Sequence, residues 1–188
     1  MTKPKFAHIV FQTAQPQAMR DWYCAVLDAH VVYSDETLSF LTYDEEHHRV
    51  ALLHPPAPFE QKSALTAALH HSAYTFESID DLLDRYVTLR DRGITPAVCV
   101  AHGVTTSMYY RDPDRNFVEL QIDRFADPDQ ATAYMNGPEY AADSVGPAFD
   151  PEELLVARRA GATAEELGDR AWALKAELGN PLDVLMGG

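Results

Sequence analysis

The sequence has 188 residues and a mass of 21.0 kDa, and its 46% hydrophobic and 23% charged residues suffice for one ordinary globular domain or two small fused modules. No run approaches the roughly 18 to 20 consecutive apolar residues of a membrane span, and the start MTKPKFAHIV lacks a signal peptide's apolar core. Two cysteines exclude a disulfide framework, and a net charge of −14 disfavours binding to nucleic acid and anionic membranes. We therefore expect a cytoplasmic protein with no nucleic-acid or membrane partner.

The negative charge is concentrated in the last third of the chain. From Ala126 to Gly188 there are 12 Asp and Glu against 4 Lys and Arg, a net charge of −8, which leaves −6 of the total −14 for residues 1–125. This shift predicts a boundary near Phe125.

An internal repeat organises residues 1–125. A shift of 63 residues, without a gap, aligns four similar pairs: His8 with His71, Phe11 with Tyr74, Asp21 with Asp84, and Tyr23 with Tyr86. Two modules of similar structure are therefore predicted.

The first module is predicted to open with a strand at residues 6–12, which is rich in aromatic and β-branched residues. A helix follows from about Pro16 to Leu27, because apolar residues recur there at helical spacing. Three further strands are predicted at residues 30–35, 37–44 and 48–54.

The second module repeats this order. Its first strand is predicted at residues 70–76, and its helix is capped by Ser78 or Asp80 and stopped by Gly93. Three strands follow at residues 96–102, 105–112 and 116–123.

The predicted fold class is α+β, with two paired βαβββ modules. A four-stranded curved sheet exposes one face that a single module cannot bury, so the modules should pair into a partly open sheet around a metal cleft. We expect three parts: the first module at 1–62, the second at 63–125, and an acidic, mostly helical extension at 126–188.

The extension carries two helix-start signals. Residues 126–150 contain many turn formers and are predicted to be irregular. Asp150 followed by Pro151 predicts one helix start, and a capping box from Thr163 to Glu166 predicts a helix that runs to about Leu178. The extension could form a lid, a dimer contact or a disordered acidic end, and we favour packing on the body or on a second subunit.

Two histidines and a glutamate form the candidate metal site. His8 and His71 lie in the first strands of the two modules, and Glu119 lies 48 residues after His71 in the last strand. Two imidazoles and a carboxylate can occupy one face of an octahedral ion and leave about three positions for other ligands. Singly, each residue has a structural alternative as a core histidine or a solvated charge. The repeat favours a metal, because it makes the histidines equivalent, and an unpaired Glu119 in an apolar strand is costly.

These residues resemble a known superfamily. His8 in FAHIVF, His71 in HHSAYTF and the run SMYYRDPDRNFVEL from Ser107 to Leu120 are similar to the vicinal oxygen chelate superfamily, and within it to single-domain type I extradiol dioxygenases. The resemblance covers about residues 5–124. It implies that His8, His71 and Glu119 bind Fe(II), with Mn(II) also acceptable to these donors, and that the partners are a small aromatic diol and O2. A homodimer is also expected. Arg115 departs from the family pattern, which has glycine in this turn.

The resemblance also implies two catalytic residues. Tyr109 matches the family tyrosine that hydrogen-bonds a substrate oxygen, and strand alternation permits it to face the cleft with Glu119. His102 resembles the family histidine near the substrate and could handle protons, with a surface-loop histidine as the alternative. His48 and His54 could also line the cleft, whereas His30 and His70 have no predicted role.

Two other functions remain open on this fold. A glyoxalase-like isomerase or epimerase would need a fourth protein ligand such as His54, although Pro55 and Pro56 indicate that the strand has ended there. A drug-sequestering protein of the bleomycin-resistance type would hold a small molecule without metal. The intact ligand set argues against that second alternative.

Overall fold

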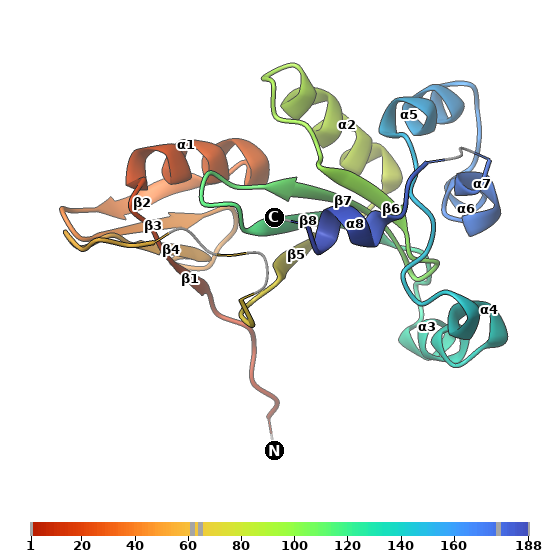
Figure 1. The fold of residues 1–188 in the computed structure, drawn as a ribbon, viewed down its shortest axis with the longest axis horizontal. Coiled ribbons are helices and arrows are strands. Elements are labelled where there is room, and N and C mark those ends of the chain that lie inside the picture. The colour runs from red at the N-terminus through yellow and green to blue at the C-terminus, as the bar shows by residue number, and fades with distance from the viewer. Residues whose placement is uncertain (1, 61–62, 64–65, 176–177, 188) are drawn as a thin grey trace. The chain divides into compact units, whose positions relative to one another are not determined.

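The structure is a computed structural model that describes residues 2–60, 63, 66–175 and 178–187. The chain forms two compact units, drawn in Figure 1 with colour running from red at the N-terminus to blue at the C-terminus. The first unit comprises Met1–Lys62 with Asp112–Asn116, and the second comprises Ser63–Arg111 with Phe117–Gly188.

The first unit contains one four-stranded sheet and one long helix. β1 (Ile9–Gln12) precedes α1 (Pro16–Leu27), and β2 (His30–Ser34), β3 (Leu38–Thr42) and β4 (Val50–Leu53) follow. The strand order is β1-β4-β3-β2, with β1 parallel to β4 and the other pairs antiparallel. α1 buries Met19, Tyr23 and Val26, which recur at helical spacing and therefore share one face of the helix.

The second unit repeats this order. β5 (His71–Thr75) precedes α2 (Ile79–Arg90), and β6 (Val98–Ala101), β7 (Thr105–Arg111) and β8 (Phe117–Asp123) follow, in the sheet order β5-β8-β7-β6. The Ser78 hydroxyl caps α2 by accepting from the Asp81 backbone N–H. The predicted α+β class, with two βαβββ modules, is confirmed.

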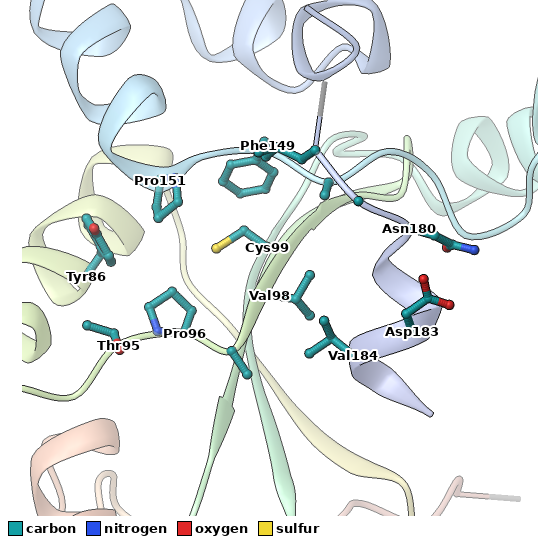
Figure 2. A pocket seen from close by; sticks show the side chains of 14 residues that line it. Tyr86, Thr95, Pro96, Val98, Cys99, Phe149, Pro151, Asn180, Asp183 and Val184 are labelled. Atoms are coloured by element: carbon teal, nitrogen blue, oxygen red, sulfur yellow. The ribbon is translucent and has the colours of Figure 1, made fainter. Parts of the chain in front are cut away.

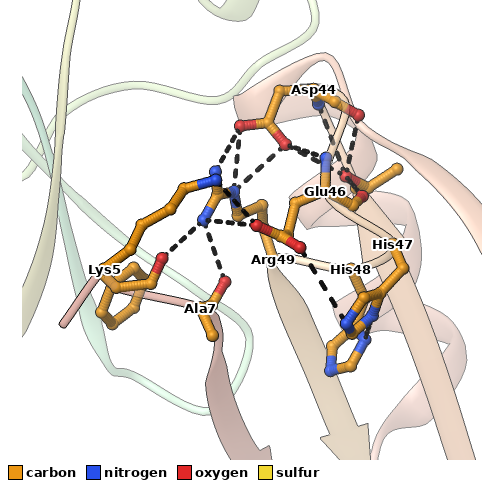
Figure 3. Close-up of polar contacts among 9 residues, drawn as sticks. Lys5, Ala7, Asp44, Glu46, His47, His48 and Arg49 are labelled. Carbon is orange, nitrogen blue, oxygen red and sulfur yellow. Dashed lines mark hydrogen bonds and ion pairs between the residues drawn. The ribbon is translucent and has the colours of Figure 1, made fainter. Parts of the chain in front are cut away.

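The first strand is shorter than predicted, and His8 lies one residue before it. β1 begins at Ile9, and the guanidinium of Arg49 donates to the carbonyls of Phe6 and Ala7 at 2.8 and 3.1 Å. Asp44 in turn binds Arg49 through both carboxylate oxygens, as Figure 3 shows. A side chain therefore satisfies backbone carbonyls that a longer strand would have paired within the sheet.

The turn that joins β7 to β8 keeps a left-handed residue. Arg115 has φ of 68° at the position where the family pattern has glycine. Its backbone N–H donates to the Asp112 carbonyl at 2.8 Å, and the Asp112 carboxylate accepts from Asn116. The departure from glycine thus leaves an arginine in a backbone conformation that side chains disfavour.

The C-terminal extension is more helical than predicted at its start. Residues 126–150, predicted to be irregular, contain α3 (Pro128–Met135) and α4 (Pro138–Ala142), so that prediction is wrong. Each of these helices begins with a proline at its first position, and Asp127 caps α3, so the turn formers act here as helix-start signals.

The two predicted helix starts in the extension are confirmed, but the second helix ends early. Asp150 caps α5 (Pro151–Arg159), and the Thr163–Glu166 capping box opens α6 (Ala164–Leu167). Gly168 ends α6, and Asp169 then caps α7 (Arg170–Ala173). The helix predicted to reach Leu178 is therefore broken, and its residues 176–177 lie outside the described part. α8 (Pro181–Leu185) follows. Throughout the described ranges, no helix combines the length and the apolar character that crossing a bilayer requires.

Candidate metal centre

His71 and Glu119 meet on one face of the second sheet. β5 and β8 are parallel neighbours, and Ala73 pairs with Glu119, so His71, two residues before Ala73, points to the same side. Nε2 of His71 lies 3.0 Å from Oε2 of Glu119, and the Glu119 side chain is only 5% exposed. Strand register thus brings together two of the three predicted metal ligands.

The buried Glu119 carboxylate is held in its charged form. Burial by itself raises its pKa, but hydrogen bonds from His71, Ser107 and Tyr109 outweigh that effect, and the pKa lies below its usual value. A charged carboxylate beside an imidazole nitrogen is a donor pair suited to a divalent transition metal.

Tyr109 lies directly opposite Glu119 in the antiparallel pairing of β7 with β8. Burial, followed by the charge of Glu119, raises the pKa of its phenol, which therefore stays protonated. The hydroxyl lies 2.9 Å from Nε2 of His102 and also within hydrogen-bonding reach of Glu119. Its single proton thus faces two acceptors.

His102 is half-buried, and its surroundings set its tautomer. Nδ1 donates to the carbonyl of Val145, because a carbonyl can only accept, and this leaves Nε2 of the neutral ring as the acceptor for Tyr109. Burial lowers the pKa of His102, which favours the neutral ring. Arg170, a buried residue of the C-terminal extension, donates to the His102 carbonyl and thereby fixes the loop that carries His102.

His8 lies in the first unit, apart in the chain from the pair on β5 and β8. Its ring lies 4.3 Å, centroid to centroid, from that of His48, which stacks on Phe40 at 4.2 Å. His54, the other histidine considered from sequence, lies with Nε2 3.1 Å from the Ser39 hydroxyl. In the described part of the second unit, no third His, Cys, Asp or Glu joins His71 and Glu119 in a metal-binding group.

One further histidine at this site has no predicted role from sequence. Nδ1 of His70 lies 2.7 Å from Nδ1 of His71, and its Nε2 lies 3.0 Å from the carbonyl of Leu185 in α8. The adjacent pair His70-His71 is visible in the sequence. The residue whose carbonyl contacts His70, Leu185 in α8, follows more than a hundred residues later, and no spacing rule connects the two positions.

A separate cavity of about 420 Å³ lies at β6 (Figure 2). Its lining includes Tyr86, Cys99, Phe149, Asn180 and Asp183. Burial raises the pKa of the Cys99 thiol, so this sulfur stays protonated.

Known proteins resemble the chain at the level of both sequence and fold. Residues 5–120 match the family described as the Glyoxalase/Bleomycin resistance protein/Dioxygenase superfamily. The chain belongs to this superfamily. It is 56% identical to biphenyl-2,3-diol 1,2-dioxygenase 2 and 53% identical to biphenyl-2,3-diol 1,2-dioxygenase 3, both from Rhodococcus globerulus, over 97% of each chain.

A solved structure from the same superfamily shares the fold. It is a glyoxylase/bleomycin resistance protein/dioxygenase domain from Frankia sp. EAN1pec, with 16% sequence identity and a TM-score of 0.56, and the match covers 67% of this chain and 96% of that one. This similarity speaks to the fold alone.

Proposed function

We propose that the chain is an extradiol ring-cleaving dioxygenase that acts on a catechol-like aromatic diol with O2. The observation that carries the proposal is the pairing of His71 with Glu119 on one sheet face, in a chain that matches two biphenyl-2,3-diol dioxygenases over 97% of its length. Biphenyl-2,3-diol is therefore the first substrate to test.

The donor set fits a divalent transition metal. His71 and Glu119 supply one nitrogen and one charged oxygen 3.0 Å apart, and we propose His8 as the third donor. Fe(II) is the proposed metal, and Mn(II) is the alternative that the same donors accept. When bound, the metal supplies a site at which a diol and O2 can meet and exchange electrons.

Tyr109 and His102 are proposed to handle the diol's protons. The Tyr109 hydroxyl stays protonated and can donate to a diol oxygen beside Glu119. The neutral His102 ring presents the lone pair of Nε2 to that hydroxyl, so Tyr109 can pass its own proton to His102 as its oxygen takes a proton from the diol. Burial of Tyr109 and Glu119 limits the competition of water for these hydrogen bonds.

The test is a ring-cleavage assay with the full chain. Protein purified without oxygen is loaded with Fe(II) or Mn(II), mixed with biphenyl-2,3-diol or other catechols, and exposed to air. We expect O2 uptake and a coloured product, both lost in Glu119→Gln and retained in the exposed-carboxylate control Glu36→Gln. If neither metal-loaded form gives colour or O2 uptake with any diol, the proposed reaction is wrong.

Two further expectations belong to this proposal. The chain is proposed to work as a cytoplasmic homodimer, which light scattering of the purified protein tests. The division into parts 1–62, 63–125 and 126–188 is proposed to hold for folding as well, which limited proteolysis tests. An isomerase with His54 as a fourth ligand would instead show four protein donors in metal spectroscopy.

A further inference from the structure

A chain of hydrogen bonds leads from the C-terminal helix to His71. The Leu185 carbonyl in α8 lies 3.0 Å from Nε2 of His70, and Nδ1 of His70 lies 2.7 Å from Nδ1 of His71. On its other side, Nε2 of His71 faces Glu119 at 3.0 Å. Both nitrogens of each ring therefore have a partner.

The direction of these bonds follows from the first acceptor. The Leu185 carbonyl can only accept, so Nε2 of His70 is a donor and Nδ1 of a neutral His70 ring is an acceptor. Nδ1 of His71 must then donate to His70, and Nε2 of His71, whose proton the Glu119 carboxylate accepts here, is the nitrogen at which a metal would replace that proton. This is the nitrogen that a metal held with Glu119 requires.

Two more contacts hold His70 and α8 in place. The His70 ring stacks on Phe117 at 5.4 Å between centroids, with an interplanar angle of 20°. The Arg111 guanidinium donates to the carbonyls of Val184 and Gly187 at 3.1 and 2.6 Å, which satisfies acceptors at the end of α8. A strand residue therefore holds the backbone on both sides of Leu185, whose carbonyl meets His70.

We propose that His70 is a positioning residue for the metal ligand His71, and that α8 anchors it through the Leu185 carbonyl. This inference rests on the proposed metal-dependent function. It assigns the end of the acidic extension a part in the metal site, because the carbonyl of α8 determines which nitrogen of His71 is free to bind. Hydrogen-bond partners of ligating histidines typically contribute about 10- to 100-fold to metal affinity.

Two conservative variants separate the two bonds of His70. In His70→Asn, the amide oxygen takes the place of Nδ1 and can accept from His71, but the side chain no longer reaches Leu185. In His70→Gln, the amide nitrogen takes the place of Nε2 and can donate to Leu185, but no acceptor faces His71. His70→Ala removes both bonds, and His30→Ala changes an exposed histidine on β2 as the matched control.

Metal affinity and the ring proton of His71 are measured on the full chain. Co(II) affinity is determined by competition with a chelator, and NMR of the metal-free protein detects the Nδ1 proton of His71. We expect His70→Ala and His70→Gln to lose about 10- to 100-fold in Co(II) affinity together with the protected Nδ1 proton, and His70→Asn to lose less. His30→Ala should match the parent.

Each contrary outcome contradicts a defined claim. If His70→Ala binds Co(II) within about twofold of the parent, or if the Asn and Gln variants are equal, the positioning role is wrong while the metal site stands. If the parent binds no metal, the proposed function fails. The positioning role then fails with it, whatever the Nδ1 proton shows.

Discussion

Replacing Tyr23 by phenylalanine tests what fixes the β7–β8 turn. Tyr23 is fully buried, and its hydroxyl donates to Oδ2 of Asp112 at 3.1 Å. Asp112 is 3% exposed and also accepts from the backbone and side-chain nitrogens of Asn116, at 2.8 and 2.9 Å. This turn lies between the strands that place Tyr109 opposite Glu119, so its stability bears on the candidate site.

The expected cost follows from the charge of the acceptor. A hydrogen bond to a charged group is worth about 1.5 to 3 kcal/mol, and phenylalanine keeps the ring, so no cavity is added. Burial raises the pKa of Asp112, and the hydrogen bonds from Asn116 and Tyr23 oppose that rise. Tyr23→Phe should therefore lower the free energy of unfolding by about 1.5 to 3 kcal/mol and raise the pKa of Asp112 further.

Tyr110→Phe is the matched control. Tyr110 is also fully buried, but its hydroxyl faces the Met108 sulfur at 3.9 Å, which is a weak acceptor. Urea denaturation of both variants should show a lower midpoint for Tyr23→Phe at unchanged slope and a change below about 1 kcal/mol for Tyr110→Phe. Equal midpoints for the two variants would refute the argument that the Asp112 carboxylate holds the turn.

Three other predictions follow from single residues. Arg115→Gly should raise the free energy of unfolding by up to about 1 kcal/mol. A left-handed backbone costs a non-glycine residue about 1 to 2 kcal/mol, and the greater entropy of glycine in the unfolded chain offsets part of the gain from removing that strain. An equal gain in Arg115→Ala would contradict this explanation. Tyr109→Phe should lower kcat about 10²- to 10⁴-fold at unchanged Co(II) affinity, and a loss of affinity instead would assign Tyr109 to metal binding. Burial lowers the pKa of His102 below 6.5, so the unfolded state binds more protons below that pH. The melting temperature of metal-free protein should therefore rise with pH up to about 6.5 and rise less steeply in His102→Gln, whereas equal slopes would show that His102 does not contribute.

Local signals in the sequence predict most of the architecture. The 63-residue repeat predicts two modules because equivalent positions fold alike, and the two sheets indeed have the same strand order. Capping residues such as Ser78 and Asp150 predict helix starts because their side chains accept from the first free backbone N–H groups. The pairing of Glu119 with His71 instead follows from the strand order within the second sheet, in which β5 and β8 are parallel neighbours.

The predictions from sequence fail where one signal has two structural meanings, or where long-range contacts determine the bounds of an element or the role of a residue. Proline and aspartate in residues 126–150 mark both turns and helix starts, and the structure forms helices there. β1 starts at Ile9 because Arg49, 40 residues later, takes the preceding carbonyls. The role inferred for His70 depends on a carbonyl in α8, and no periodicity reports such a contact.

Anomalous diffraction at the iron edge from crystals grown without oxygen tests the metal site most directly. We expect one strong peak within bonding distance of a His8 ring nitrogen, Nε2 of His71 and a Glu119 oxygen, with the remaining positions free of protein atoms. A peak bound by a different set of side chains, or no peak in protein that contains iron, would contradict it.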